Sequence, residues 1–387
     1  MKGQLHLILS TDATVSDIER YGMLPWNRAM LDAYREAFDI DMYSADTRDF
    51  SRLLGVRHHP CCPASMRLLP KRLRQAVFYL ALLSKARKMK GVIRTLSPNL
   101  AILPEIRRLS GSPVIVDFHY DWSEKTQADY GGAKSRIAPW FQRRCMSAAD
   151  LVIASTADLR QRARREFPDR VIHIPNFVDR RVFHPSEKRE PRIVFAGRLH
   201  WAKGCDVLMR AFNLLAPDHR DVELVILGTG EEEQRIRGML TPEMEGRVRM
   251  LGSVPHTELA TLVGGARIFA FPTVTVEGQP KALIEAMACG TPCVCSDVPG
   301  VKGLIRDCDN GLLVPPSDPA ALARAFDRLL ADEVLWRRLS ESCLRGASRF
   351  DGRHLLKRQI RVMRLCGERA RGKQAPGRHL QRAAIPC

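Results

Sequence analysis

The sequence predicts an α/β protein with two Rossmann-like domains, each a doubly wound sheet of parallel strands with helices on both faces. A chain of 387 residues is longer than one hydrophobic core usually organises, which favours two domains of roughly 180 residues each. Hydrophobic residues make up 45% of the chain, enough to bury two cores. Short β-branched runs alternate with longer helical patterns in both halves, as parallel strands joined by crossover helices require.

The predicted strands follow one another in the same way in the two halves. In the first half we expect strands at residues 5–9, 40–43, 114–118, 151–154 and 171–174. In the second half we expect them at residues 193–196, 222–227, 248–251, 268–271 and 292–295, at spacings of roughly 20 to 30 residues as in βα units.

Residues 175–191 hold three prolines and a cluster of charges, so we interpret them as the linker between the two halves. The domains are therefore expected at residues 1–180 and 181–350, with a ligand cleft between them. Apolar residues recur at helical spacing from Leu355 to Leu365, which predicts a last helix at residues 351–368. Residues 369–387 are basic and lack such a pattern, so we expect a disordered tail.

The composition argues against several classes of protein. The longest apolar run, residues 76–83, is well short of the roughly 20 residues of a membrane-spanning helix. The apolar piece at residues 5–9 is too brief for the core of a signal peptide, so we expect a cytoplasmic protein. The eleven cysteines are scattered, and Cys61-Cys62 and Cys293-Val294-Cys295 lack the CxxC spacing of a zinc site. We expect reduced thiols and no metal.

The net charge of +18 indicates an anionic partner. Eight Lys or Arg and no Asp or Glu lie in residues 67–90, around the apolar run. This segment is either an interfacial helix on an anionic membrane surface or an ordinary crossover helix with a basic solvent face. The first interpretation places the protein peripherally on the inner face of the membrane. Nucleic acid is not an expected partner, because no recognised motif or aromatic interleaving accompanies the charge.

Two cations, Arg198 and Lys203, lie on a loop that is bounded by Gly197 and Gly204 and directly follows a predicted strand. Open α/β sheets bind ligands at the carboxyl ends of their strands. Glycine lets the backbone approach a phosphate, arginine offers forked donors, and lysine offers a mobile charge. The loop is therefore either a diphosphate site or a solvated basic loop.

Residues 277–288 begin as a glycine-containing loop and continue as a helix, with Pro280 suited to the first turn. Backbone N–H groups at the positive end of a helix suit a diphosphate. Glu277, before the helix, and Glu285, in its second turn, can both reach one pocket. There they can accept hydrogen bonds from the vicinal hydroxyls of a ribose or a sugar. The alternative interpretation is that one glutamate caps the helix and the other is an ordinary acid on the helix surface. The candidate donor-binding residues are Glu277, Gly278, Gln279, Lys281, Ala282 and Glu285.

Two further signals are weaker. Gly228 and Gly230 form a turn after a predicted strand, which either approaches a nucleotide closely or only links strand to helix. His119 follows the predicted strand 114–118, where a lone histidine is more often structural. Residues 310–314 are interpreted as a tight turn into a short apolar run.

Taken in order, GRLHWAKG (197–204), EGQPKALIE (277–285), AMACGTPCVCSDVPG (286–300) and NGLLVPP (310–316) resemble the C-terminal domain of the family 4 retaining glycosyltransferases. ADLVIASTADL and VIHIPNFVDRRVFHP resemble the end of the family's first domain and its linker, so the resemblance covers roughly residues 145–366. It implies the GT-B fold, in which two Rossmann-like domains face a cleft and a C-terminal helix returns to the first domain. It also implies metal-independent, retaining transfer of a sugar from a UDP- or GDP-sugar to a glycan or lipid-linked acceptor, without a cofactor.

The resemblance assigns roles to matching residues. Arg198 and Lys203 would hold the diphosphate of the donor and neutralise the leaving group, for which preorganised donors contribute roughly 3 kcal/mol each by analogy with oxyanion holes. Glu285 would bind the ribose hydroxyls and Glu277 the transferred sugar. His119 resembles the first-domain histidine that faces the donor sugar from across the cleft. We therefore expect His119, Arg198, Lys203 and Glu277 to be catalytic.

The sequence departs from the family in two places. Residues 10–16 stand where the family has a glycine-rich turn, and the next glycine is Gly22. This motivates an alternative, a catalytically inactive nucleotide-sugar-binding or scaffold protein of the same fold. An epimerase or a phosphorylase on this architecture would need a different residue set. In the linker, Asn176-Phe177 replaces the family's Asn-Gly, and because phenylalanine tolerates positive φ poorly we expect a different turn.

Overall fold

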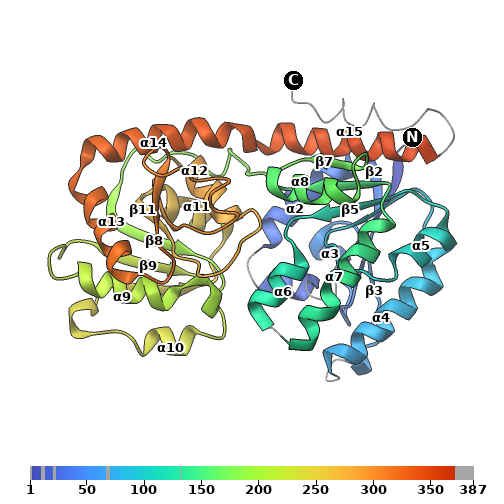
Figure 1. Cartoon of the computed structure of the whole chain (residues 1–387), viewed down its shortest axis with the longest axis horizontal. Helices are drawn as coiled ribbons and strands as arrows, with labels where there is room; N and C mark the ends of the chain where they lie inside the picture. The colour runs from blue at the N-terminus through green and yellow to red at the C-terminus, as the bar shows by residue number, and fades with distance from the viewer. Residues whose placement is uncertain (1, 10–13, 21–22, 67–69, 131, 371–387) are drawn as a thin grey trace. The chain divides into compact units, whose positions relative to one another are not determined.

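The computed structural model describes residues 2–9, 14–20, 23–66, 70–130 and 132–370. The chain divides into two compact units (Figure 1). Unit 1 holds Met1–Pro175 together with His354–Cys387, and unit 2 holds Asn176–Arg353. The chain therefore leaves unit 1 once and returns to it near its end.

Unit 1 is built on a sheet whose described strands all pair in parallel, in the order β3-β2-β1-β4-β5-β6-β7. The strands are β1 (Gly3–Ile8), β2 (Phe38–Ser44), β3 (Arg57–Pro60), β4 (Val92–Thr95), β5 (Val114–Phe118), β6 (Leu151–Ala154) and β7 (Val171–His173). Chain order runs outward from β1 to β3 and then from β4 to β7, so the sheet is doubly wound.

The helices of unit 1 lie between these strands in the chain, except for the last helix, which follows unit 2. They are α1 (Val15–Arg20), α2 (Leu24–Arg35), α3 (Ser51–Leu54), α4 (Lys71–Ala86), α5 (Leu103–Ser110), α6 (Trp122–Tyr130), α7 (Gly132–Ser147), α8 (Ala157–Glu166) and the last helix α15 (Gly352–Ala370), with a 3-10 turn at Ala64–Met66. One face of the sheet is covered by α4, α5, α7 and α8, which bury a shared apolar cluster that includes Phe78, Ile106 and Cys145.

Unit 2 repeats the plan with a parallel sheet whose described strands have the order β10-β9-β8-β11-β12-β13. The strands are β8 (Glu190–Ala196), β9 (Glu223–Leu227), β10 (Val248–Gly252), β11 (Ala266–Phe271), β12 (Cys293–Ser296) and β13 (Gly311–Val314). The order reverses between β8 and β11, and this reversal marks the topological switch point, where open α/β sheets bind their ligands.

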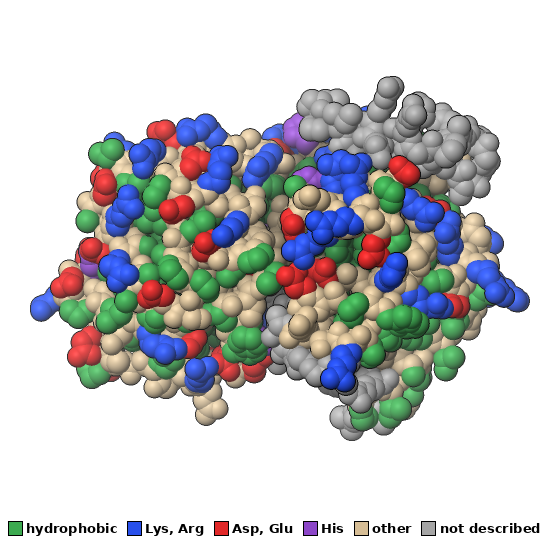
Figure 2. Space-filling model, in the orientation of Figure 1, with side chains coloured by type: hydrophobic (Ala, Val, Ile, Leu, Met, Phe, Trp, Pro, Cys, Tyr) green, Lys and Arg blue, Asp and Glu red, His purple; other side chains and the backbone are tan. Residues whose placement is uncertain are grey.

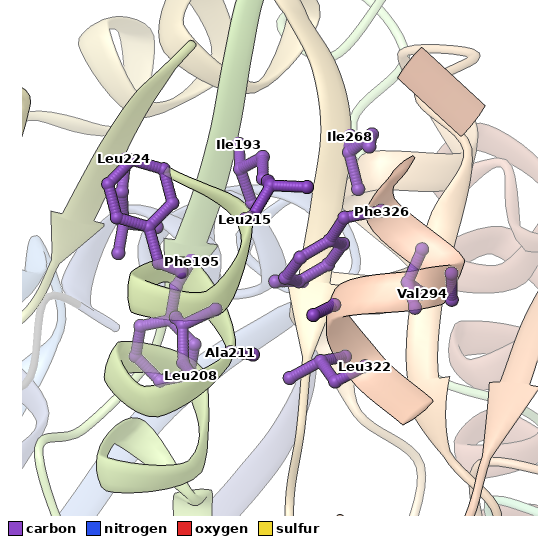
Figure 3. Packing of buried hydrophobic residues seen from close by; sticks show 14 of the residues in the cluster. Ile193, Phe195, Leu208, Ala211, Leu215, Leu224, Ile268, Val294, Leu322 and Phe326 are labelled. Atoms are coloured by element: carbon purple, nitrogen blue, oxygen red, sulfur yellow. The ribbon is translucent and has the colours of Figure 1, made fainter. Parts of the chain in front are cut away.

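The sheet of unit 2 has helices on both faces. They are α9 (Cys205–Leu215), α10 (Glu233–Arg237), α11 (His256–Gly264), α12 (Lys281–Ala288), α13 (Pro319–Ala331) and α14 (Glu333–Ala347), with 3-10 turns at Trp201–Lys203, Pro242–Met244 and Ser348–Phe350. One face packs against α9 and α13, where Phe195, Leu208 and Phe326 meet (Figure 3). The other face packs against α11 and α12.

Local sequence explains where several helices begin. Asp318 accepts a hydrogen bond from the backbone N–H of Ala321 at 2.9 Å and precedes Pro319 in the first turn of α13. Asp332 caps α14 in the same way, accepting from Leu335 N at 2.8 Å. A side-chain oxygen at this position satisfies an N–H that has no partner within the helix.

All ten predicted strands are confirmed, with ends that differ by a few residues. Three strands were missed: β3, β4 and β13. The first two carry His58, His59 and Arg94, whose polar side chains interrupt the apolar pattern but are satisfied by buried partners. The third was interpreted as a tight turn into a short apolar run; residues 308–310 form the turn, and the apolar run 311–314 is a strand that pairs along the whole of β12.

The linker prediction of residues 175–191 is too long at its C-terminal end, because β8 already begins at Glu190 and pairs with Ala266. Phe177 is not among the described residues with positive φ, so the chain makes no left-handed turn at this position. In the part of the chain that the structure describes, no helix has the length and apolarity to cross a membrane. The predicted tail lies outside the described residues from residue 371 on, as do residues 10–13 of the segment that replaces the glycine-rich turn.

Candidate functional site

Most of the predicted donor-binding residues of unit 2 lie in loops at one edge of its sheet, while Lys281, Ala282 and Glu285 lie in the helix that follows the third loop. Residues 197–204 follow β8, residues 228–231 follow β9, and residues 272–280 follow β11. Because these strands are parallel, their carboxyl ends share an edge. The first and third of these loops flank the switch point between β8 and β11, so the sequence motifs fall where this architecture binds ligands.

Two glycines let the loop after β8 lie against the loop after β9. A Cβ on Gly228, whose φ is +121°, would lie 2.0 Å from the carbonyl oxygen of Gly197. A Cβ on Gly230 would lie 2.1 Å from the carbonyl oxygen of Leu199. Gly197 N in turn donates to Leu227 O at 3.0 Å. These glycines therefore hold the loop of residues 197–204 in place, and their contact with a nucleotide remains a prediction.

Lys203 and Glu277 meet across the switch point. Lys203 Nζ lies 2.5 Å from Glu277 Oε1, and their side chains are 27% and 13% exposed. Thr273 Oγ1 lies 2.9 Å from the same carboxylate oxygen and 2.9 Å from the carbonyl oxygen of Ala202, and its one proton can be donated to either. A glycine at position 204, with φ +67°, allows this close approach, because a Cβ there would lie 2.0 Å from the carbonyl oxygen of Pro272. The fold thus brings these two predicted site residues together.

Arg198 contacts a carboxylate that sequence reasoning missed. Its Nη2 lies 3.2 and 3.1 Å from the two carboxylate oxygens of Glu231, which directly follows Gly230. His200 Nε2 lies 3.4 Å from the same carboxylate. Burial tends to raise the pKa of Glu231, but its own backbone N–H together with Arg198 and His200 holds that pKa below its usual value. Arg198 and Glu231 are both close to half exposed, so an incoming anion can replace this carboxylate.

The helix α12 carries the second predicted glutamate. Pro280 precedes the helix, whose first turn leaves N–H groups without intrahelical partners. Glu285 is buried, and its Oε1 lies 3.2 Å from Nε2 of His256, which begins α11. Burial lowers the pKa of Lys281 to about 8, although the charge of Glu285 one turn away opposes this. Ala282 is half-buried against the core.

Gln279 forms hydrogen bonds with Asn176. Its side-chain Oε1 accepts from Asn176 N at 2.5 Å, and its carbonyl oxygen accepts from Asn176 Nδ2 at 2.9 Å. Gly278 lies under a tight turn, since a Cβ on Gly300 would lie 2.5 Å from its carbonyl oxygen. Both residues therefore shape the loop before α12, and donor binding by either stays a prediction.

His119 belongs to unit 1, where it directly follows β5. Its Nε2 lies 3.3 Å from Oδ2 of Asp117, a fully buried carboxylate. The imidazole side chain is 25% exposed, while Nδ1 is buried and has no hydrogen-bond partner among the described residues. The predicted position of this histidine across a cleft from the donor is a relation between the two units and remains a prediction.

The residues that sequence reasoning missed are partners of those it identified: Glu231, Thr273, His256 and Asp117. Asp117 could have been identified from the sequence, because an aspartate inside an otherwise apolar buried strand requires a partner. Glu231 gave a weaker one as the first of three glutamates after the glycine turn.

The cysteines of the described residues are free thiols; Cys308 is exposed and the other nine are buried. Within the same residues, no three His, Cys, Asp or Glu side chains gather as metal ligands. Burial raises the pKa of the Cys61, Cys145 and Cys205 thiols to about 12.

Comparison with known protein families matches both units. Residues 190–332 match the family described as glycosyl transferases group 1. Residues 27–176 match the family described as glycosyl transferase 4-like domain. The two matches together cover most of the chain.

Two similar proteins are named as enzymes that transfer sugars. The chain is 31% identical over 253 residues to phosphatidyl-myo-inositol mannosyltransferase of Mycobacterium leprae, covering 63% of this chain and 65% of that protein. It is 29% identical over 254 residues to D-inositol 3-phosphate glycosyltransferase 1 of Catenulispora acidiphila, covering 59% of this chain and 60% of that protein. The matched segments thus span less than two thirds of either relative.

Solved structures show the fold. Sucrose-phosphate synthase of Thermosynechococcus elongatus aligns with a TM-score of 0.73 at 21% identity, covering 94% of this chain and 98% of that one. HepE of Anabaena in complex with UDP aligns with a TM-score of 0.72 at 18% identity, covering 94% of this chain and 100% of that one. These likenesses confirm the predicted GT-B fold class of two Rossmann-like units.

Proposed function

We propose that the chain transfers a sugar from a nucleoside diphosphate sugar to a glycan or lipid-linked acceptor, because each of its two units matches a glycosyl transferase family. The observation that carries this proposal is the set of charged contacts at the switch point of unit 2. Lys203 and Arg198 lie on the loop after β8, and each is held by a carboxylate that a diphosphate can replace.

Different residues of unit 2 bind different parts of the donor. The diphosphate takes the places of the Glu231 and Glu277 carboxylates beside the two cations, because phosphate oxygens accept the same charge-assisted hydrogen bonds. Glu277, released from Lys203, then binds hydroxyls of the transferred sugar. Glu285, oriented by His256, binds the ribose hydroxyls.

The chemistry follows from where charge develops. As the bond between sugar and diphosphate breaks, negative charge grows on the leaving oxygen, and Arg198 and Lys203 stabilise it by roughly 3 kcal/mol each. Because protein cations neutralise this charge, we propose that transfer needs no divalent metal. From the resemblance to the family 4 retaining glycosyltransferases, we propose that transfer proceeds with retention of the anomeric configuration. Unchanged rates in EDTA and an α-linked product from an α-linked donor, seen by proton NMR, are the expected results. A β-linked product would contradict retention.

We further propose that the acceptor is reached at an anionic membrane surface through α4. On one side of this helix Phe78 and Leu82 are buried in the core, as in an ordinary crossover helix. On the rest of it Leu73 and Leu80 are 53% and 66% exposed. Arg74 is half-buried on the same helix, while residues 67–69 of the basic segment lie outside the described residues.

The helix α7 of the same unit supports this surface. Ile137 is 53% exposed and Trp140 is 58% exposed, and Arg144 stacks on the indole with 5.5 Å between its guanidinium carbon and the ring centroid. Hydrophobic side chains lie beside basic ones over this part of unit 1 (Figure 2). Exposed apolar side chains together with cations are typical of helices that rest on anionic lipid.

Vesicle sedimentation tests the membrane proposal. We expect the protein to sediment with vesicles containing phosphatidylglycerol and not with phosphatidylcholine vesicles. Leu80→Gln should weaken sedimentation several-fold. Leu214→Gln, on the exposed side of α9 in unit 2, is the matched control because Leu214 is 54% exposed, and it should leave sedimentation unchanged. Equal recovery with both kinds of vesicle would contradict the proposal.

Thermal unfolding tests donor binding. HepE has been solved with UDP and with UDP-glucose, so UDP-sugars are the first donors to screen, followed by GDP-sugars. A ligand present at 100 times its Kd stabilises the folded state by about 2.7 kcal/mol, which moves the Tm by several degrees. No shift with any sugar nucleotide would overturn the proposal. Release of nucleoside diphosphate above background separates an enzyme from a catalytically inactive sugar-nucleotide-binding protein.

A further inference from the structure

A buried ion pair lies beneath the strand end that carries His119. Arg94 in β4 donates from Nε to the two carboxylate oxygens of Asp117 at 3.0 and 3.1 Å, and from Nη2 to Oδ2 at 2.9 Å. Arg94 is 1% exposed and Asp117 is not exposed at all. A charged pair this deeply buried is costly to desolvate, so its geometry is held by further contacts.

Those contacts come from two helices of unit 1. Arg94 Nη1 donates to Tyr34 Oη in α2 at 2.6 Å and to Gln359 Oε1 in α15 at 3.1 Å. Tyr34 Oη also donates to Gln359 Oε1. The guanidinium therefore has partners on three sides and cannot turn away from Asp117.

Asp117 is ionised in this setting. Burial alone would raise the pKa of Asp117, but the charge of Arg94 and the hydrogen bond from His119 more than offset it and hold that pKa below its usual value. An ionised carboxylate has no proton to donate. The 3.3 Å contact between Oδ2 and His119 Nε2 therefore requires the proton on Nε2.

The other ring nitrogen is then an acceptor without a donor. In the neutral imidazole Nδ1 carries a lone pair. Nδ1 is buried and lacks a hydrogen-bond partner among the described residues. An unsatisfied buried acceptor costs about 1–3 kcal/mol, so it favours any ligand group that supplies the missing donor.

We propose that Asp117, held by Arg94, is a positioning residue that fixes His119 with its proton on Nε2, so that Nδ1 accepts a hydrogen bond from a hydroxyl of the bound sugar. This rests on the proposed function for its ligand and on the structure for its geometry. The same Arg94 ties this arrangement to α15, which is 265 residues away in sequence.

Histidine side-chain nitrogen NMR on the wild-type protein tests the geometry without any variant. In a sample labelled with ¹⁵N-histidine, the His119 signals are those absent from His119→Gln. We expect a protonated Nε2 and an unprotonated Nδ1 for His119, and a shift of the Nδ1 signal when a turnover-competent sugar nucleotide is added. A proton on Nδ1 in the free protein would overturn the proposal, as would an Nδ1 signal that the donor leaves unchanged.

Asp117→Asn tests the causal step. Its amide oxygen stays with Arg94 and its NH₂ turns to the ring, so the proton of His119 should move to Nδ1. We expect kcat to fall at least tenfold with the donor KM changed less than threefold. Asp41→Asn is the matched control, because Asp41 is also buried and contacts an arginine and the ring of His59, with no link to His119. It should leave the His119 signals and kcat unchanged.

The outcomes separate the two proposals. If Asp117→Asn unfolds, the wild-type spectrum still decides the tautomer. If that spectrum is as expected but the wild type releases no nucleotide from any donor, the proposed function fails and the sugar contact fails with it, while the positioning by Asp117 stands. Wild-type kcat in a folded Asp117→Asn protein with an inverted tautomer would overturn the role of the tautomer in transfer.

Discussion

Glu231→Gln should tighten donor binding, which is the reverse of what loss of a binding residue does. In the ligand-free protein Glu231 holds Arg198 at 3.1 Å, and a donor diphosphate must displace it. The two side chains are 47% and 43% exposed, so this ion pair is worth about 0.2–1 kcal/mol. At 1.4 kcal/mol per tenfold change, releasing Arg198 lowers the Kd of the nucleoside diphosphate by about 1.4- to fivefold.

Isothermal titration of UDP and GDP into wild type and Glu231→Gln measures this effect. Glu233→Gln is the matched control, because Glu233 is two residues away and pairs with Arg237, so it removes the same charge without removing the contact between Glu231 and Arg198. Its Kd should match that of wild type within a factor of about two. The difference between the two variants should shrink at 0.5 M salt, since exposed charges are then screened. A Kd at least fivefold weaker in Glu231→Gln would refute the reasoning and make Glu231 a ligand of the donor.

Three further outcomes follow from the structure. Lys281, with a pKa of about 8, is charged below that pH and neutral above it, so the Kd for a diphosphate should be flat up to pH 8 and then rise, approaching about tenfold per pH unit. Lys281→Arg should flatten that rise. An equally steep rise of the Kd in this variant would contradict the assignment of the pH dependence to Lys281. Gly230→Ala should weaken UDP binding at least tenfold, because its Cβ would lie 2.1 Å from the carbonyl oxygen of Leu199, whereas Gly238→Ala meets nothing closer than 3.4 Å and should bind normally. Phe326→Ala, in the fully buried cluster of unit 2, should lower the free energy of unfolding by about 3–5 kcal/mol in urea titrations, and a loss below about 1 kcal/mol would contradict the packing.

The sequence was sufficient to predict the strands that are mostly apolar, although Asp117 lies inside one of them. Residues 114–118 and 151–154 have the same bounds in the structure as in the prediction. Strand β4 could not be predicted, because Arg94 breaks its apolar run. The carboxylate that makes a buried arginine tolerable comes from 23 residues later, and the amide oxygen from 265 residues later, so no local pattern carries the information.

The candidate site divides in a similar way. Arg198, Lys203 and Glu277 were identified because they stand beside glycines after apolar runs, a pattern that fixes their place at a sheet edge. Their pairing was not predictable. The Lys203–Glu277 contact depends on β8 lying next to β11, and the Arg198–Glu231 contact depends on β8 lying next to β9. Strand order is a property of the whole sheet, so only the fold brings these charges together.

The proposal that the loop after β8 neutralises a leaving diphosphate is tested most directly by nucleotide release. The measurement is the initial rate at which wild type, Arg198→Ala and Lys203→Ala release nucleoside diphosphate from the sugar nucleotide that gives the largest Tm shift. Arg210→Ala, an exposed residue on α9 that pairs with Asp206, controls for the loss of a surface cation. At roughly 3 kcal/mol each, the two site variants should be slower by about 100-fold or more with unchanged Tm, and the control should match wild type. Rates within threefold of wild type in both folded site variants would contradict the account.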